Sequence, residues 1–397
     1  MTGGLTASSG GHAGDIAAVA MSPDGRLAIS AGLDGTARLW DATAGSAPAD
    51  EPFSALLHVL ALAPDGRTAI TVDMYGIGRI RSLNSESAET VFDTCQQMCM
   101  DGAVSRDGQR LAVVDSRGAL VVWDVQDLPR LIGTHPHDRA ATCQFIGGRT
   151  AVSGSVDGSV IAWNVETGDR LWTFGLREGL PVFAVDERRG LIMVGSASGQ
   201  VVLLEAASGH PVSHLHDGSD AVASCTFGHG GILAAGTAAG DVLMWVLRDR
   251  AVVGRRGGSP GRHEGRVLHL AAGTPEHPII SGSADHRVGL WPAEAGAEVT
   301  WLNGHDAPVR QVLNGPHNGL IMSAGDDRTL RAWAAAGAPV ALLPIEGHGQ
   351  LLTTGPDGEL IVCGDSGGFT YLARLRGTTT TTSAEAGGAV GQFSSGG

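Results

Sequence analysis

Residues 27–41 read LAISAGLDGTARLWD, and this stretch decides the fold. Two short runs of aliphatic and β-branched residues flank a break at Asp34 and Gly35, which is the pattern of a β-hairpin. The same pattern returns every 39 to 46 residues. Close copies are TAVSGSVDGSVIAWN from Thr150, IISGSADHRVGLWP from Ile279 and LIMSAGDDRTLRAWA from Leu320; weaker copies begin at Thr68, Arg110, Leu191, Ile232 and Leu360. The chain therefore contains nine copies of one unit.

Each unit contains four short strand runs. Two form the hairpin, a third precedes it and often ends in a turn such as Pro23-Asp24-Gly25, and a fourth, such as residues 170–174, comes before that. Four strands in roughly 40 residues are typical of one blade of a β-propeller. We therefore predict an all-β fold with nine four-stranded blades in one ring; a ring of seven or eight blades is the alternative.

The propeller is expected to occupy residues 1–376. Residues 377–397, rich in Thr, Gly, Ala and Ser, are predicted to be a disordered tail. The short run Leu5-Thr6-Ala7 is a candidate for the outer strand of the last blade, because such a strand closes the ring and removes an open sheet edge.

Composition excludes several classes of function. The formal net charge is −14, which disfavours general nucleic-acid binding. No lysine is present, so lysine nucleophiles and Schiff-base chemistry are ruled out, and the exclusive use of Arg fits a bacterial source with a GC-rich genome. Five cysteines, no signal peptide and no long apolar run predict a cytoplasmic protein without a membrane partner.

The pair Gly11-His12, followed about thirty residues later by Trp40-Asp41, resembles the WD-repeat signature. The resemblance extends from residue 11 to about 373, and we identify the chain as a stand-alone bacterial member of that family. It implies a buried tetrad of His, Ser, Asp and Trp in each regular blade, since indole N–H only donates and carboxylate only accepts hydrogen bonds. The four matching sets are His12, Ser30, Asp34 and Trp40; His135, Ser153, Asp157 and Trp163; His263, Ser281, Asp285 and Trp291; and His305, Ser323, Asp327 and Trp333.

Five copies depart from this pattern, and we expect apolar packing and strand pairing to hold them. The replacements at tetrad positions are Tyr75 and Arg81; Val113 and Arg117; Val194, Ser198 and Leu204; Ala235 and Ala239; and Val362, Ser366 and Leu372.

The repeated Ser, His and Asp do not predict an enzyme. The same trio occurs four times with Trp at a blade-building position, whereas catalysis needs one exposed nucleophile beside a base and an oxyanion hole. Cys95 and Cys99, with His58 in the vicinity, are interpreted as half-buried thiols and not as metal ligands. We therefore expect neither catalysis nor a cofactor or metal.

The segment from Arg248 to Arg266 contains six arginines and causes the longest spacing between copies. We interpret it as a solvated insertion, and a loop that grips an acidic partner is the alternative.

The family resemblance implies three partner-contact positions per blade on the face that opens the central channel. The candidate residues are Asp15, Leu56, His58, Met74, Met98, Met100, Arg266, Leu268, Arg310, Asp326, Gln350 and Asp365. Leu56 and the three methionines would form an adaptable apolar rim, unless the irregular blades bury them. The leading hypothesis is a scaffold for a protein or peptide partner. The alternatives are a sensor working with a separate NTPase, protease or kinase, and an enzyme at the channel mouth.

Overall fold

The computed structural model describes most of the chain. The described residues are 2–5, 11–22, 24–41, 50–52, 57–63, 68–82, 89–95, 97–126, 128–176, 179, 181–218, 220–248, 250–256, 261–294, 296–315, 320–354, 360–376 and 391–392. The predicted disordered tail lies outside these residues except for residues 391–392, so its disorder stays a prediction.

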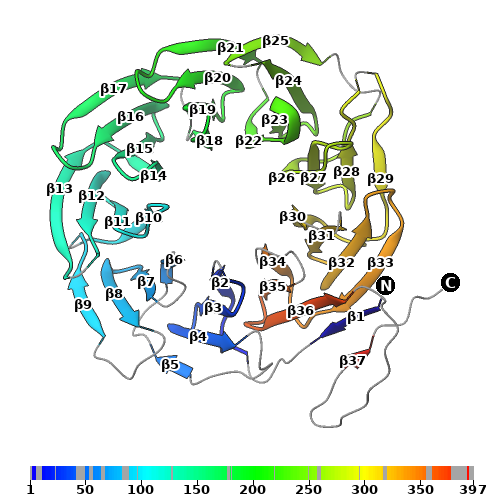
Figure 1. Cartoon of the computed structure of the whole chain (residues 1–397), viewed down its shortest axis with the longest axis horizontal. Coiled ribbons are helices and arrows are strands. Elements are labelled where there is room, and N and C mark those ends of the chain that lie inside the picture. The colour runs from blue at the N-terminus through cyan, green and yellow to red at the C-terminus, as the bar shows by residue number, and fades with distance from the viewer. Residues whose placement is uncertain are drawn as a thin grey trace.

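Nine antiparallel sheets surround a central channel (Figure 1). Blades one to three comprise β2 (Ile16–Met21), β3 (Leu27–Gly32), β4 (Thr36–Asp41), β5 (Asp50–Pro52); β6 (Leu57–Leu62), β7 (Thr68–Asp73), β8 (Ile77–Ser82), β9 (Thr90–Asp93); and β10 (Cys99–Val104), β11 (Arg110–Asp115), β12 (Ala119–Asp124), β13 (Arg130–Pro136). Blades four to six comprise β14 (Ala140–Ile146), β15 (Thr150–Ser155), β16 (Ser159–Asn164), β17 (Arg170–Gly175); β18 (Val182–Asp186), β19 (Leu191–Gly195), β20 (Gln200–Glu205), β21 (Pro211–Asp217); and β22 (Val222–Phe227), β23 (Ile232–Thr237), β24 (Val242–Arg248), β25 (Ala251–Arg256).

Blades seven to nine complete the ring. They comprise β26 (Val267–Ala272), β27 (Ile279–Ser283), β28 (Val288–Trp291), β29 (Thr300–Leu302); β30 (Val309–Asn314), β31 (Leu320–Gly325), β32 (Thr329–Ala334), β33 (Pro339–Pro344); and β34 (Gly349–Thr354), β35 (Leu360–Asp365), β36 (Thr370–Arg376), β1 (Thr2–Leu5), β37 (Gly391–Gln392). One short 3-10 helix, η1 (His229–Gly231), precedes β23. The predicted all-β fold and its nine blades are confirmed. In the ranges described above, no helix has the length and apolar character needed to cross a membrane.

Blade nine joins the two ends of the chain. Strand β1 pairs antiparallel with β36, with Leu5 opposite Ala373 and Thr2 opposite Arg376. The predicted closing strand therefore exists but begins earlier than expected. It ends at Leu5, and Thr6 and Ala7 lie outside the described residues.

The core lies between neighbouring blades. Middle strands such as β19 are buried along their whole length because sheets cover both of their faces. One cluster packs Val152 and Val160 of blade four against Ile192 and Val202 of blade five. A single blade thus leaves its apolar faces exposed, and stability depends on the stack.

The innermost strand of each blade, such as β2 or β6, lines the channel (Figure 1). Loops that enter these inner strands, and the turns between the second and third strands, share one side of the ring. We call this side the channel face. The turns that follow the inner strands, and the loops that enter the outer strands, lie on the opposite face.

The arginine-rich segment after Arg248 is not simply an insertion. Residues 251–256 form β25, the outer strand of blade six. Arg250 donates to Glu205 of blade five at 2.8 Å. Because the segment supplies a strand that the blade requires, the interpretation as a solvated insertion is wrong for these residues; residues 257–260 lie outside the described ranges.

Candidate functional site

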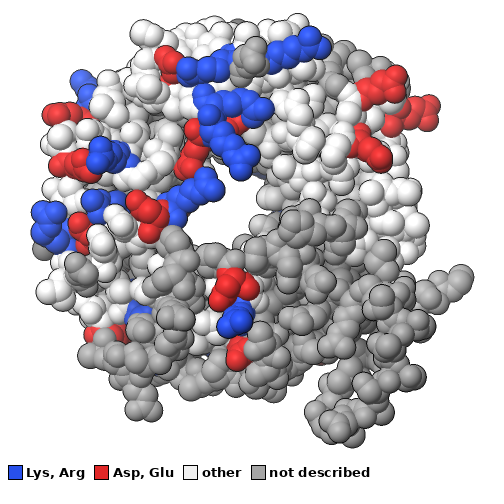
Figure 2. All heavy atoms as spheres, in the orientation of Figure 1, with Lys and Arg blue, Asp and Glu red and all other residues white. Residues whose placement is uncertain are grey.

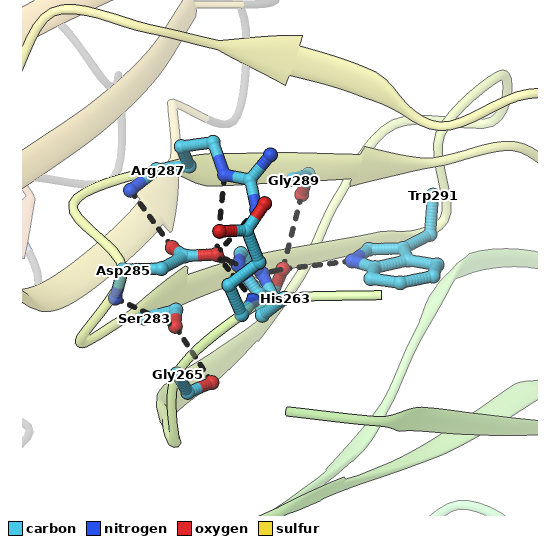
Figure 3. A network of polar contacts seen from close by, with 9 residues as sticks. His263, Gly265, Ser283, Asp285, Arg287, Gly289 and Trp291 are labelled. Carbon is cyan, nitrogen blue, oxygen red and sulfur yellow. Dashed lines mark hydrogen bonds and ion pairs between the residues drawn. The ribbon is translucent and has the colours of Figure 1, made fainter. Parts of the chain in front are cut away.

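The tetrad of blade seven is a continuous chain of hydrogen bonds from Asp285 through His263 and Ser281 to Trp291 (Figure 3). His263 Nδ1 lies 2.9 Å from Asp285 Oδ2, and its Nε2 lies 2.7 Å from Ser281 Oγ. Trp291 Nε1 donates to the same Ser281 Oγ at 2.7 Å. Burial alone would raise the pKa of Asp285, but hydrogen bonds from His263 and from two backbone amides hold it well below its usual range. The network therefore ties the loop that precedes β26, which contains His263, to the β27–β28 hairpin, which contains Ser281 and Asp285.

Blades one and eight contain the same arrangement. His12 lies 3.0 Å from both Asp34 Oδ1 and Ser30 Oγ, while His305 lies 2.9 Å from Asp327 Oδ1. In each tetrad the serine is buried and already bonded to both His and Trp, as with Ser323. These serines are occupied structural groups and are not reachable by a substrate.

Blade four corrects one sequence assignment. His135 has the expected spacing from Ser153, but it lies inside strand β13, and its ring stacks on Trp163 with the ring centroids 5.1 Å apart. Within the described residues its Nε2 has no hydrogen-bond partner. His137 takes the position instead, with Nδ1 2.7 Å from Ser153 Oγ and Nε2 2.8 Å from Ser159 Oγ. The assignment of His135 is wrong because strand β13 continues through it.

In three irregular blades, a buried aspartate bonds to the backbone of the turn. Asp73, Asp115 and Asp365 lie two residues before the usual tetrad aspartate and are all buried. Each accepts hydrogen bonds from two backbone amides of the following turn, at 2.8 to 3.0 Å. Apolar packing is therefore supplemented by a buried carboxylate, which sequence reasoning missed because it considered only the tetrad positions.

Asp365 was expected to contact a partner, and the structure contradicts this. Its side chain is fully buried and accepts from Gly347 N at 2.7 Å and from Tyr371 Oη at 3.0 Å. The cause is a register offset of one residue. The turn glycine with positive φ is Gly368. The tetrad positions assigned from the sequence to Val362, Ser366 and Leu372 therefore belong to the residue that follows each of them.

Replacing Asp365 with Ala should lower the free energy of unfolding by about 2–4 kcal/mol, because several buried donors lose their acceptor. Urea unfolding followed by circular dichroism measures the change. Asp220→Ala, at an exposed position, is the matched control and should differ little from the wild type. Equal stability of the two variants would contradict the structural role of Asp365.

The predicted contact residues of blades two and three form an apolar area on the channel face. We define the methionine patch as Met74 and Tyr75 of blade two together with Met98 and Met100 of blade three. Met98 and Met100 are 44% and 42% exposed, Tyr75 is 63% exposed, and Met74 is half-buried. The amide of Cys99, between the two exposed methionines, donates to Met74 O at 2.8 Å, so the turns of two blades meet here. Leu56 and the side chain of His58 lie outside the described residues.

Across the ring, blades seven to nine form a polar pocket of about 560 Å³. It is lined by Leu268, His269, Arg310, Gln311, Asp326, His348 and Gln350. Four of these residues, Leu268, Arg310, Asp326 and Gln350, were predicted as contacts, and the structure brings them together. Asp15 is half-buried and Arg266 is exposed, and neither lines this pocket. Of the lining residues that sequence reasoning missed, His269 and Gln311 directly follow a predicted contact residue, and His348 lies two residues before Gln350.

An ion pair organises the polar pocket. Arg310 donates to Asp326 through Nε at 2.9 Å and through a terminal nitrogen at 2.6 Å, which is bidentate geometry. His348 Nδ1 donates to the carbonyl of Asp326 at 2.6 Å. This bond uses Nδ1, so Nε2 is the ring nitrogen that remains for a ligand in the pocket. The pocket can therefore recognise polar groups through oriented donors and acceptors.

The predicted thiols contribute no reactive group to these surfaces. Burial raises the pKa of Cys99 to about 12 and also raises the pKa of Cys95, so both thiols stay protonated at neutral pH. Within the described ranges, no three His, Cys, Asp or Glu residues are grouped so that they could hold a metal ion.

Two family models match parts of the sequence. The model described as "WD domain, G-beta repeat" matches residues 3–41 and 296–334. A second model, described as "Outer membrane protein assembly factor BamB", matches residues 37–216.

Similar curated proteins include WD repeat-containing protein 36 of Homo sapiens, with 23% identity over 57% of this chain, and Elongator complex protein 2 of Rattus norvegicus, with 33% identity over 36% of this chain. The matched parts span 26% and 20% of those two proteins.

Solved structures share the fold at low sequence identity. The computationally designed Ika8 protein superposes with a TM-score of 0.65 and 18% identity, covering 94% of this chain and 100% of its own. Sqt1 of Saccharomyces cerevisiae superposes with a TM-score of 0.66 and 14% identity, with the same coverage of both chains.

Proposed function

This chain is a WD-repeat β-propeller, and from that premise we propose that it is a scaffold that binds a protein or peptide partner on its channel face. Propellers of this family generally bind protein partners. The proposal includes no catalysis, because the Ser and His of the regular blades are fully engaged in structural tetrads.

The methionine patch is the observation that carries the proposal. Exposed Met98, Met100 and Tyr75 cost free energy in water, and burying them against a partner recovers roughly 25 cal/mol for each Å² of apolar area. Unbranched methionine side chains adapt to different partner shapes. A rigid ring holds this adaptable area at the rim of the channel face, which suits recognition of an apolar segment.

The test is a pair of charge substitutions. A Met98→Glu, Met100→Glu double variant should lose affinity for captured partners by at least about tenfold, since a buried carboxylate without a partner opposes binding. Cross-linked capture from a lysate of the source organism, quantified by mass spectrometry, measures the loss. Leu128→Glu is the matched control, because Leu128 is 77% exposed in the same blade but on the opposite face. Equal capture by both variants would remove the patch from the proposal.

A regulatory role is the second candidate, favoured by the polar pocket. Its volume of about 560 Å³ is in the range of small-molecule sites. In that case the propeller would sense a polar ligand and act with a separate NTPase, protease or kinase. The bacterial source, the stand-alone organisation and the cytoplasmic location stay predictions.

A further inference from the structure

The opposite face of the ring contains a concentration of positive charge. In Figure 2, blue side chains border the channel in the sector that β10, β14 and β18 occupy in Figure 1. We define the arginine rim as Arg106, Arg188 and Arg189, which follow the inner strands of blades three and five. A local positive field on a chain of net charge −14 indicates a specific and not a general attraction for anions.

The three arginines differ in their engagement. Arg189 is held by Asp186 at 2.5 Å, and Arg106, whose side chain is 75% exposed, contacts Glu187 at 3.1 Å. Arg188 is exposed and, among the residues that the structure describes, makes no hydrogen bond or ion pair. A free guanidinium has a fork of donors that matches the two oxygens of a carboxylate. Arg188 is therefore the available cation of the rim.

Glu187 links three blades at the end of the channel that the arginine rim borders, which we call the mouth. One carboxylate oxygen accepts from Arg106 of blade three, and the other accepts from the amide of Gly147 of blade four at 3.1 Å. The turn of blade four at this point is Gly147-Gly148, which has no side chains. This turn therefore adds no side chain to the mouth between Arg106 of blade three and Arg188 of blade five.

Behind the rim lies a hollow of about 580 Å³. Its lining combines the charged residues with apolar side chains, among them Val104, Phe145, Val185 and Phe227. Phe145 is the penultimate residue of β14 in blade four and Phe227 is the last residue of β22 in blade six, so the apolar floor spans blades four to six. A fitting ligand needs both an anionic group and an apolar group within a short distance.

We propose that this mouth is a second docking site, which binds a short acidic peptide segment of a partner protein with apolar residues between its carboxylates. One carboxylate pairs with Arg188 and an apolar side chain enters the hollow beside Phe145 and Phe227. The carboxylates of Asp186 and Glu187 repel a dense polyanion, which favours a peptide over a nucleic acid. This site is separate from the methionine patch and does not depend on it.

The experiment measures fluorescence anisotropy of a labelled peptide, Gly-Asp-Phe-Asp-Leu-Glu-Gly, titrated with the full chain. The wild type should bind it saturably, and Arg188→Glu should weaken binding by at least about tenfold. Arg188 makes no ion pair or hydrogen bond with any residue that the structure describes, so the variant should keep the wild-type melting temperature. Arg130→Glu is the charge-matched control, since the Arg130 side chain is 73% exposed on outer strand β13.

Two comparison probes complete the test. A peptide with Asn and Gln in place of the acidic residues should bind at least about tenfold more weakly than the acidic peptide. A labelled single-stranded oligonucleotide should bind more weakly than the acidic peptide at the same ionic strength. The proposal would be overturned by no saturable peptide binding to the wild type, by equal losses in Arg188→Glu and Arg130→Glu, or by preferential binding of the oligonucleotide.

Discussion

Replacing Trp291 with Ala should lower the free energy of unfolding by about 3–5 kcal/mol, as large-to-small changes of buried aromatic residues do. Trp291 is 1% exposed and packs with Ile232 and Met244 of blade six. Its loss opens a cavity between two blades and leaves Ser281 Oγ without its indole donor. Urea unfolding of the full chain, followed by circular dichroism, measures the effect.

Trp291→Phe separates packing from hydrogen bonding. The phenyl ring keeps much of the apolar contact but has no N–H, so this variant should lose about 1–3 kcal/mol. The expected order of stability is wild type, Phe variant, Ala variant. An Ala variant within about 1 kcal/mol of the wild type would show that the interface between blades six and seven does not depend on this side chain.

Deleting residues 1–5 should convert a closed ring into an open one. The deletion removes β1 and exposes the unpaired edge of β36, which is a template for pairing with another chain. We expect soluble oligomers or aggregates in size-exclusion chromatography coupled to light scattering. We also expect an apparent melting temperature lower by at least about 5 °C.

Deleting residues 393–397 is the control for simple shortening of the chain, and this variant should elute like the wild type. A monomeric, equally stable protein after removal of residues 1–5 would mean that β1 does not close the ring. Oligomers that form equally with both deletions would point to an edge other than that of β36.

The fold was predictable from the sequence because the repeat is visible as a period. Six of the eight tryptophans mark the same position in their units, and each unit supplies its own strand runs. The tetrads of blades one, seven and eight follow from one constant spacing between His and Ser. That spacing misleads in blade four, where β13 extends through His135 and the following loop is shorter.

The candidate surfaces were predictable only in part. Contact positions transferred from the family locate the methionines and Arg310, since they depend on register alone. They fail at Asp365, where two successive glycines made the position of the turn ambiguous and a shift of one residue reverses which way a strand side chain faces. The hollow behind the arginine rim was not predictable, because its lining comes from four blades that are distant in sequence.

Blade nine has a consequence for how the protein is made. Its strands β34, β35 and β36 are synthesised after the strands of the other eight blades, whereas β1 is synthesised before them. Earlier blades can stack as they are synthesised, but the pairing of Leu5 with Ala373 must wait until β36 has been synthesised. The nascent protein is thus an arc with two unsatisfied ends, and a polypeptide released before β36 is made would remain an arc.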